Sequence, residues 1–131
     1  MNSIDIEKQI ITRLLAYPNL DKTRITRENV NYTPPTTGVW ARVTIQGGIN
    51  FMSGMADTPC TREVGTLIIQ CFDRENMGTG NVKTFADNLA KHFAYYQTNN
   101  LELLAPSVID VGFDPNTKFY QYNVSIPYRY N

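Results

Sequence analysis

The sequence predicts an α+β domain: a mainly antiparallel four-stranded sheet with two helices packed on it and an extended hairpin or loop arm. Three observations lead to this fold class. Apolar residues recur at helical spacing in 3–16 and 81–97, and at strand spacing in 39–46, 63–72, 108–113 and 118–129. The order helix, strand, strand, helix, strand, strand favours antiparallel pairs. The length of 131 residues suits a single domain, 1–131.

The first helix is predicted to cover residues 3–16. Asp5 and Glu7 lie at the positive end of its dipole, and Pro18 stops it. Its apolar residues form two neighbouring stripes, Ile4, Ile11 and Leu15 beside Ile6, Ile10 and Leu14. We therefore expect a wide apolar face of this helix to pack on the sheet.

Two strands are predicted in the first half of the chain. Residues 39–46 alternate, with Val39, Ala41, Val43 and Ile45 on one side and Trp40, Arg42, Thr44 and Gln46 on the other. Residues 63–72 are apolar on both faces, which is typical of a central strand covered on each side. The segment 17–38 reads as a long connection, because Pro34-Pro35 does not fit a central strand.

The segment 49–62, I-N-F-M-S-G-M-A-D-T-P-C-T-R, is the least regular part of the chain. Phe51, Met52 and Met55 are apolar side chains in a loop-like context. One interpretation is a hairpin tip that folds back on the core. The other is an exposed arm that reaches a partner, since flexible methionines suit adaptable contacts. Both interpretations stay open.

The second half of the chain is predicted to close with a hairpin. Asp114-Pro115-Asn116 is a tight turn between 108–113 and 118–129, and Pro127 marks an edge or a strand end. The last strand carries an alternating tyrosine stripe, Tyr120, Tyr122, Tyr128 and Tyr130. A base-stacking platform would need a row of basic residues beside it. Half-burial against a helix, or a subunit interface, is the favoured interpretation.

Composition and charge argue against several classes of protein. The formal net charge is 0, whereas nucleic-acid binders usually carry a basic excess. The basic run between Lys8 and Arg27 is interpreted as a solvated face rather than a phosphate-contacting patch. Cys60 and Cys71 are too few for a disulfide scaffold, and no stretch approaches 18 apolar residues. We expect a soluble protein made in a reducing cytoplasm that binds no membrane and no specific nucleic acid.

No residue pattern indicates catalysis. His92 is the only histidine, and its place near a helix end favours a dipole contact over acid–base chemistry or zinc binding. Asp73 and Glu75 could hold a cation, but they flank Arg74 in a polar turn. Gly78-Thr79-Gly80 lies where a phosphate-binding loop would, yet the third glycine and G-K-[ST] are missing. We predict no enzyme activity, no catalytic residue, no cofactor and no metal.

Several segments together carry a family resemblance. They are I-x-x-x-I-I-x-x-L-L in the first helix, N-V-N-Y-T-P-P before T-G-V-W-A-R-V-T-I, R-E-V-G-T-L-I-I-Q-C-F with the helix G-N-V-K-T-F-A-D-N-L-A-K-H-F, and the closing Y-Q-Y-N-V-S-I-P-Y-R-Y. In this layout the chain resembles the tail terminator, or tail-completion, proteins of long-tailed bacteriophages, the group similar to minor tail protein U. None of these segments is a catalytic signature.

The resemblance implies a subunit of a hexameric ring that caps the finished tail tube, stops its polymerisation and presents the surface that joins the head. The implied partners are further copies, the tail tube protein and a head-completion or connector protein. The implied place is the head-proximal end of the virion tail, after assembly in the host cytoplasm. A ring subunit needs two different contact surfaces and protected or paired sheet edges. The candidate interface residues are Phe51, Met52, Met55, Arg62, Ile126 and Tyr128.

Three other functions compete with this one. Another phage neck or connector component, such as a head-completion protein or stopper, would also assemble as a ring. A small enzyme or ligand-binding domain would use Asp73, Glu75 and the turn 78–80. A nucleic-acid module would use the basic region 8–27 and would bind DNA in a salt-dependent way.

Overall fold

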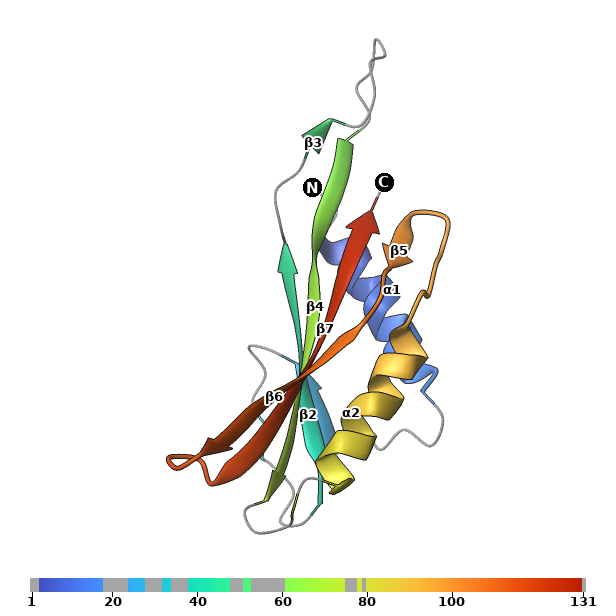
Figure 1. The fold of residues 1–131 in the computed structure, drawn as a ribbon. Helices are drawn as coiled ribbons and strands as arrows, with labels where there is room; N and C mark the ends of the chain where they lie inside the picture. The colour runs from blue at the N-terminus through green and yellow to red at the C-terminus, as the bar shows by residue number, and fades with distance from the viewer. Residues whose placement is uncertain are drawn as a thin grey trace.

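The computed structural model has one mixed sheet with two helices on it (Figure 1). It describes residues 3–17, 24–27, 32–33, 38–47, 51–52, 61–74, 78 and 80–130. The helices are α1 (Ser3–Leu15) and α2 (Gly80–Phe93). The strands are β1 (Ile25–Arg27), β2 (Trp40–Gly47), β3 (Phe51–Met52), β4 (Thr61–Arg74), β5 (Leu101–Leu103), β6 (Ser107–Asp114) and β7 (Phe119–Tyr130).

The sheet order among the described residues is β1-β2-β4-β7, with β5 and β6 following each other along the far side of β7. The short β3 pairs with the start of β4. β1 is parallel to β2, and all other pairs are antiparallel. The α+β class is therefore confirmed, but the predicted four-stranded, antiparallel sheet is wrong: the main sheet has six strands and is mixed. The missed strands have two or three residues each, too few to show a period.

The hydrophobic core lies between the sheet and both helices, which cover the same face (Figure 1). α1 contributes only one of its two predicted stripes to the buried core, because Ile4 and Leu15 are 69% and 54% exposed. The helix residues of the core are Ile6, Ile10, Leu14, Val82, Ala86, Leu89, Ala90 and Phe93. Each large side chain buried here stabilises the fold by about 1.5–3 kcal/mol.

The opposite face of the sheet carries a small aromatic cluster at one end. Trp40 and Phe72 stack with ring centroids 4.3 Å apart, and Phe119 meets Trp40 edge-on at 5.4 Å. These three residues are neighbours because Trp40 pairs with Phe72 and because β7 begins beside the end of β4. β4 is thus central, as predicted, with apolar contacts on both of its faces at this end.

The closing strand is not a sheet edge, contrary to the expectation drawn from Pro127. β7 pairs with β4 along its whole length and with β5 and β6 on its other side. In an antiparallel strand the N and C=O of one residue face the same neighbour. The Pro127 carbonyl accepts from the Leu104 N–H at 2.9 Å, so the missing proline N–H faces the irregular segment 104–106 between β5 and β6.

Candidate functional site

The most unusual surface of the described chain is β6. Four of the seven large hydrophobic residues that are exposed belong to this strand: Val108, Ile109, Val111 and Phe113. Their exposed fractions lie between 37% and 53%. Contiguous exposed apolar residues on a small protein mark a contact surface more often than a neutral one.

The exposure of β6 follows from its place in the sheet. β6 pairs with β7 on one side only, and no described strand lies on its other side. In Figure 1 the β6–β7 hairpin runs out to the lower left, away from α1 and α2. β6 has a β-bulge at Val111, where its register with β7 shifts between Asp110 and Gly112. Gly112 has a φ of 103°, a conformation that favours glycine.

Two carboxylates accompany the apolar residues of β6. The Tyr120 hydroxyl donates to Asp110, with Oδ1 and Oδ2 at 3.0 and 2.9 Å, and this bond raises the pKa of Tyr120. Asp114 Oδ1 accepts from the Asn116 N–H at 2.9 Å and so shapes the hairpin turn. The edge is therefore apolar and acidic, since the sequence from Ser107 to Thr117 contains no lysine or arginine.

The opposite edge of the sheet, β1, is basic. Arg27 lies at its end and makes a 3.7 Å contact with Glu7 of α1, both side chains being about half exposed. Arg24 lies just before the strand, and its Nη1 donates to the Val39 carbonyl at 3.2 Å. Arg24 therefore makes a hydrogen bond within its own chain, as does Arg13, which donates to the His92 carbonyl. Part of the basic run that could have suggested a phosphate-contacting patch is thus used internally.

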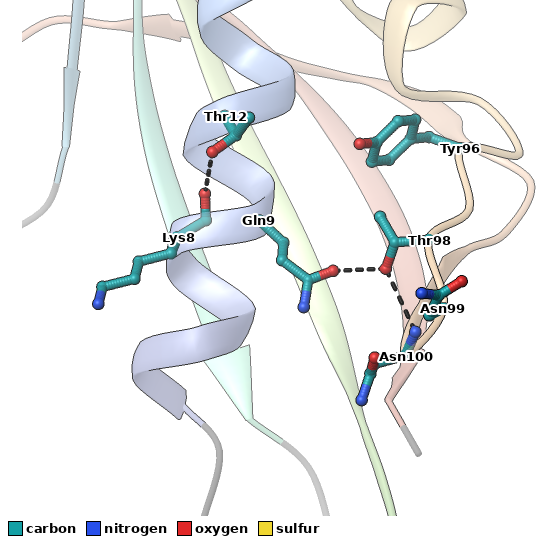
Figure 2. Close-up of a pocket in the computed structure, with 7 residues that line it drawn as sticks. All are labelled: Lys8, Gln9, Thr12, Tyr96, Thr98, Asn99 and Asn100. Carbon is teal, nitrogen blue, oxygen red and sulfur yellow. Dashed lines mark hydrogen bonds between the residues drawn. The ribbon is translucent and has the colours of Figure 1, made fainter.

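A pocket of about 400 Å³ lies between α1 and the segment after α2 (Figure 2). Its lining consists of Lys8, Gln9, Thr12, Tyr96, Thr98, Asn99 and Asn100. Figure 2 shows Gln9 and Thr98 joined across it: the Thr98 hydroxyl donates to Gln9 and accepts from the Asn100 N–H. Thr12 donates to the Lys8 carbonyl. The Gln9–Thr98 bond joins α1 to the loop, and no carboxylate, histidine or cysteine is among the seven.

The predicted interface residues fall into two groups. Phe51, Met52 and Arg62 belong to the β3–β4 pair, with Phe51 opposite Arg62, and Met55 lies outside the described residues. Ile126 and Tyr128 are 0% and 3% exposed and form part of the chain's own core. A contact of any of these six residues with another subunit stays a prediction.

The exposure of the β6 residues was not predicted. Their sequence, S-V-I-D-V-G-F-D, reads as an ordinary strand with apolar residues at adjacent positions. Such a run usually indicates burial on both faces. The available signal was the position of this run as the first strand of a predicted hairpin, which supplies a partner strand on one side only.

The other residues considered for chemistry have structural surroundings. Asp73 is 1% exposed and accepts from the Arg74 N–H at 2.8 Å, while Glu75 and Thr79 lie outside the described residues. No group of three metal-binding side chains occurs in the described part of the chain. Three of the four striped tyrosines, Tyr122, Tyr128 and Tyr130, are core residues, so the stripe does not form an exposed stacking surface.

The fold and its surfaces define a small α+β protein with an apolar sheet edge. The family model of phage tail terminator proteins matches residues 5–128, and the chain belongs to this family. It is therefore a structural protein of a phage tail, found in the virion. None of the described helices is long and apolar enough to cross a bilayer.

No curated protein matches the chain. Several solved structures are similar to this chain, and one of them matches over 100% of this chain and 96% of its own, with a TM-score of 0.74 and 16% sequence identity. At that identity the likeness shows the shared fold alone.

Proposed function

We propose that this chain forms a ring at the head-proximal end of the finished tail tube, stops tube polymerisation and presents the surface that joins the head. The observation that carries the proposal is the family match across residues 5–128. A cap of this kind needs contact surfaces on a rigid scaffold rather than reactive groups. The exposed β6 edge and the well-packed core supply such a scaffold.

The two ends of the sheet suit different contacts. The β3–β4 pair lies at one end, and the β6–β7 hairpin projects near the other (Figure 1). We assign the tube contact or a neighbouring-subunit contact to the arm with Phe51, Met52, Met55 and Arg62. In the ring, Ile126 and Tyr128 would contribute indirectly. They would stabilise β7, with which β5 and β6 pair.

The proposal is tested by making phage without this chain. We expect tails that grow beyond their normal length and do not join heads. Purified chain added to the extract should give tails of one length that join heads. Tails of normal length that join heads in its absence would overturn the proposal. Tails of normal length beside heads that lose their DNA would instead support a head-completion or stopper function.

A further inference from the structure

We infer that neighbouring copies of this chain join by sheet extension, with β6 of one copy pairing antiparallel with β1 of the next. This inference rests on the proposed ring and names the surfaces that close it. The occupant of the β6 edge is thus a second copy of the same chain.

The character of β6 supports a strand as its partner. An edge strand presents a row of backbone N–H and C=O groups, and proteins usually block such edges with lysine, proline or a very short strand. The bulge of β6 lies between Asp110 and Gly112, so Ser107–Asp110 form a regular edge. The strand contains no lysine or proline, and it exposes Val108, Ile109, Val111 and Phe113. Backbone pairing together with apolar side-chain contacts is the usual mode of strand addition.

The register across the sheet places β1 and β6 at the same level. One row runs Thr26, Arg42, Gln70, Asn123, Ile109, each residue paired with the next. Ile25–Arg27 is therefore level with Val108–Asp110 at the opposite edge. A head-to-tail contact between level edges gives little axial displacement per copy, which favours a closed ring over a helical filament.

Strand direction agrees with this arrangement. β1 is parallel to β2, and three antiparallel pairings separate β2 from β6, so β1 and β6 run in opposite directions. When a second copy continues the sheet in the same orientation, its β1 meets β6 antiparallel. Antiparallel strand pairs are slightly more stable per residue than parallel pairs.

Charge complementarity selects β1 as the partner edge. Arg27 pairs with Val43 and Asp110 with Tyr122, and both partners belong to the helix-covered face, so Arg27 and Asp110 share that face. With the two strands aligned at their common level, these residues are diagonal neighbours within reach of an arginine. The ion pair between Arg27 and Glu7 is long and exposed. Such a pair contributes little to stability, so Arg27 can leave Glu7 and pair with a carboxylate of the neighbouring copy.

The first experiment reverses these charges. Assembly is measured as the mass of the purified protein by light scattering and as the number of copies retained on purified tails. Asp110→Arg alone and Arg27→Asp alone should each weaken the contact about tenfold per interface, because like charges then face each other. The double variant should recover most of the loss. Single variants that assemble like the native chain, or a double variant that recovers nothing, would overturn the pairing of β6 with β1.

The second experiment places a positive charge on the β6 edge and has a matched control. Ile109→Lys should abolish assembly, whereas Ile4→Lys, a more exposed isoleucine on α1, should leave it unchanged. Melting temperatures near the native value show that both variants fold. A native chain that assembles neither in solution nor on tails would refute the proposed ring. A native chain that assembles, together with Ile109→Lys that assembles equally well, would refute the sheet extension alone.

Discussion

Arg13 and His92 each bond the backbone carbonyl of the other. Arg13 Nε and Nη2 donate to the His92 carbonyl at 3.0 and 2.6 Å, and His92 Nε2 lies 2.6 Å from the Arg13 carbonyl, to which it donates. Both residues lie in the last turns of their helices, where carbonyls lack the usual partner four residues on; the Arg13 carbonyl also accepts from the Ala16 N–H at 3.2 Å. This reciprocal contact joins the ends of α1 and α2, and it gives the only histidine a structural role.

Replacing Arg13 with methionine should loosen this joint. The change removes both bonds to the His92 carbonyl and the guanidinium that lies 4.6 Å from the Tyr96 ring centroid, while keeping an apolar stem. We expect the free energy of unfolding to fall by roughly 1.5–3 kcal/mol. Urea denaturation measures it. Lys8→Met, an exposed change on the same helix, is the control, and equal effects of the two would contradict the role of Arg13.

Gly65 should not tolerate alanine, because it lies opposite Tyr128 in the β4–β7 pair. A Cβ at Gly65 would come within 2.5 Å of the Tyr128 hydroxyl and still closer to the Gln46 carbonyl. We expect Gly65→Ala to lower the free energy of unfolding by about 1–3 kcal/mol through overpacking. Gly47→Ala is the matched control, since a Cβ there meets nothing within 4 Å. A melting temperature for Gly65→Ala equal to that of Gly47→Ala would rule out this tight packing.

The aromatic cluster of the outer sheet face should contribute to stability through Phe72. Its ring stacks on Trp40 at an interplanar angle of 19° and meets Phe119 edge-on. Phe72→Leu should lower the free energy of unfolding by about 1–2 kcal/mol through lost ring contacts. Phe113→Leu, on the exposed β6 strand, should change it by less than about 0.5 kcal/mol in dilute protein. Unfolding followed by Trp40 fluorescence compares them, and a larger effect at Phe113 would argue against this ranking.

Much of the fold could be predicted because its larger elements are long enough to display a period. The runs assigned to α1, β2, β4, α2, β6 and β7 all form the expected type of element. β5 could not be predicted in this way: Leu101 and Leu103 are fully buried, but L-E-L is too short to distinguish a strand from a loop. Pairing with β7, not local preference, makes it a strand.

A contact surface is harder to predict from the sequence, for a different reason. Pro127 indicates a sheet edge and so makes Tyr128 a candidate interface residue, yet the register places Tyr128 beside Gly65 in the core. Ile109 belongs to an apolar run of the kind that is usually covered on both faces, yet it is 51% exposed. Whether a strand is covered depends on the path of the helices over the sheet, and residue patterns within one strand do not encode that path.

Stability should fall at high pH because of Cys71. Burial raises the pKa of this thiol from 9.0 to about 12, so between these values the unfolded chain ionises while the folded chain does not. The unfolded state then binds fewer protons, and the free energy of unfolding should decrease by roughly 1 kcal/mol per pH unit from pH 9 to 12. Tyrosines titrate in the same range, so the measurement is the difference between Cys60→Ser and Cys60→Ser with Cys71→Ala. The Cys71→Ala protein should show the shallower decline in urea titrations, and identical slopes for the two proteins would show that Cys71 ionises as easily folded as unfolded.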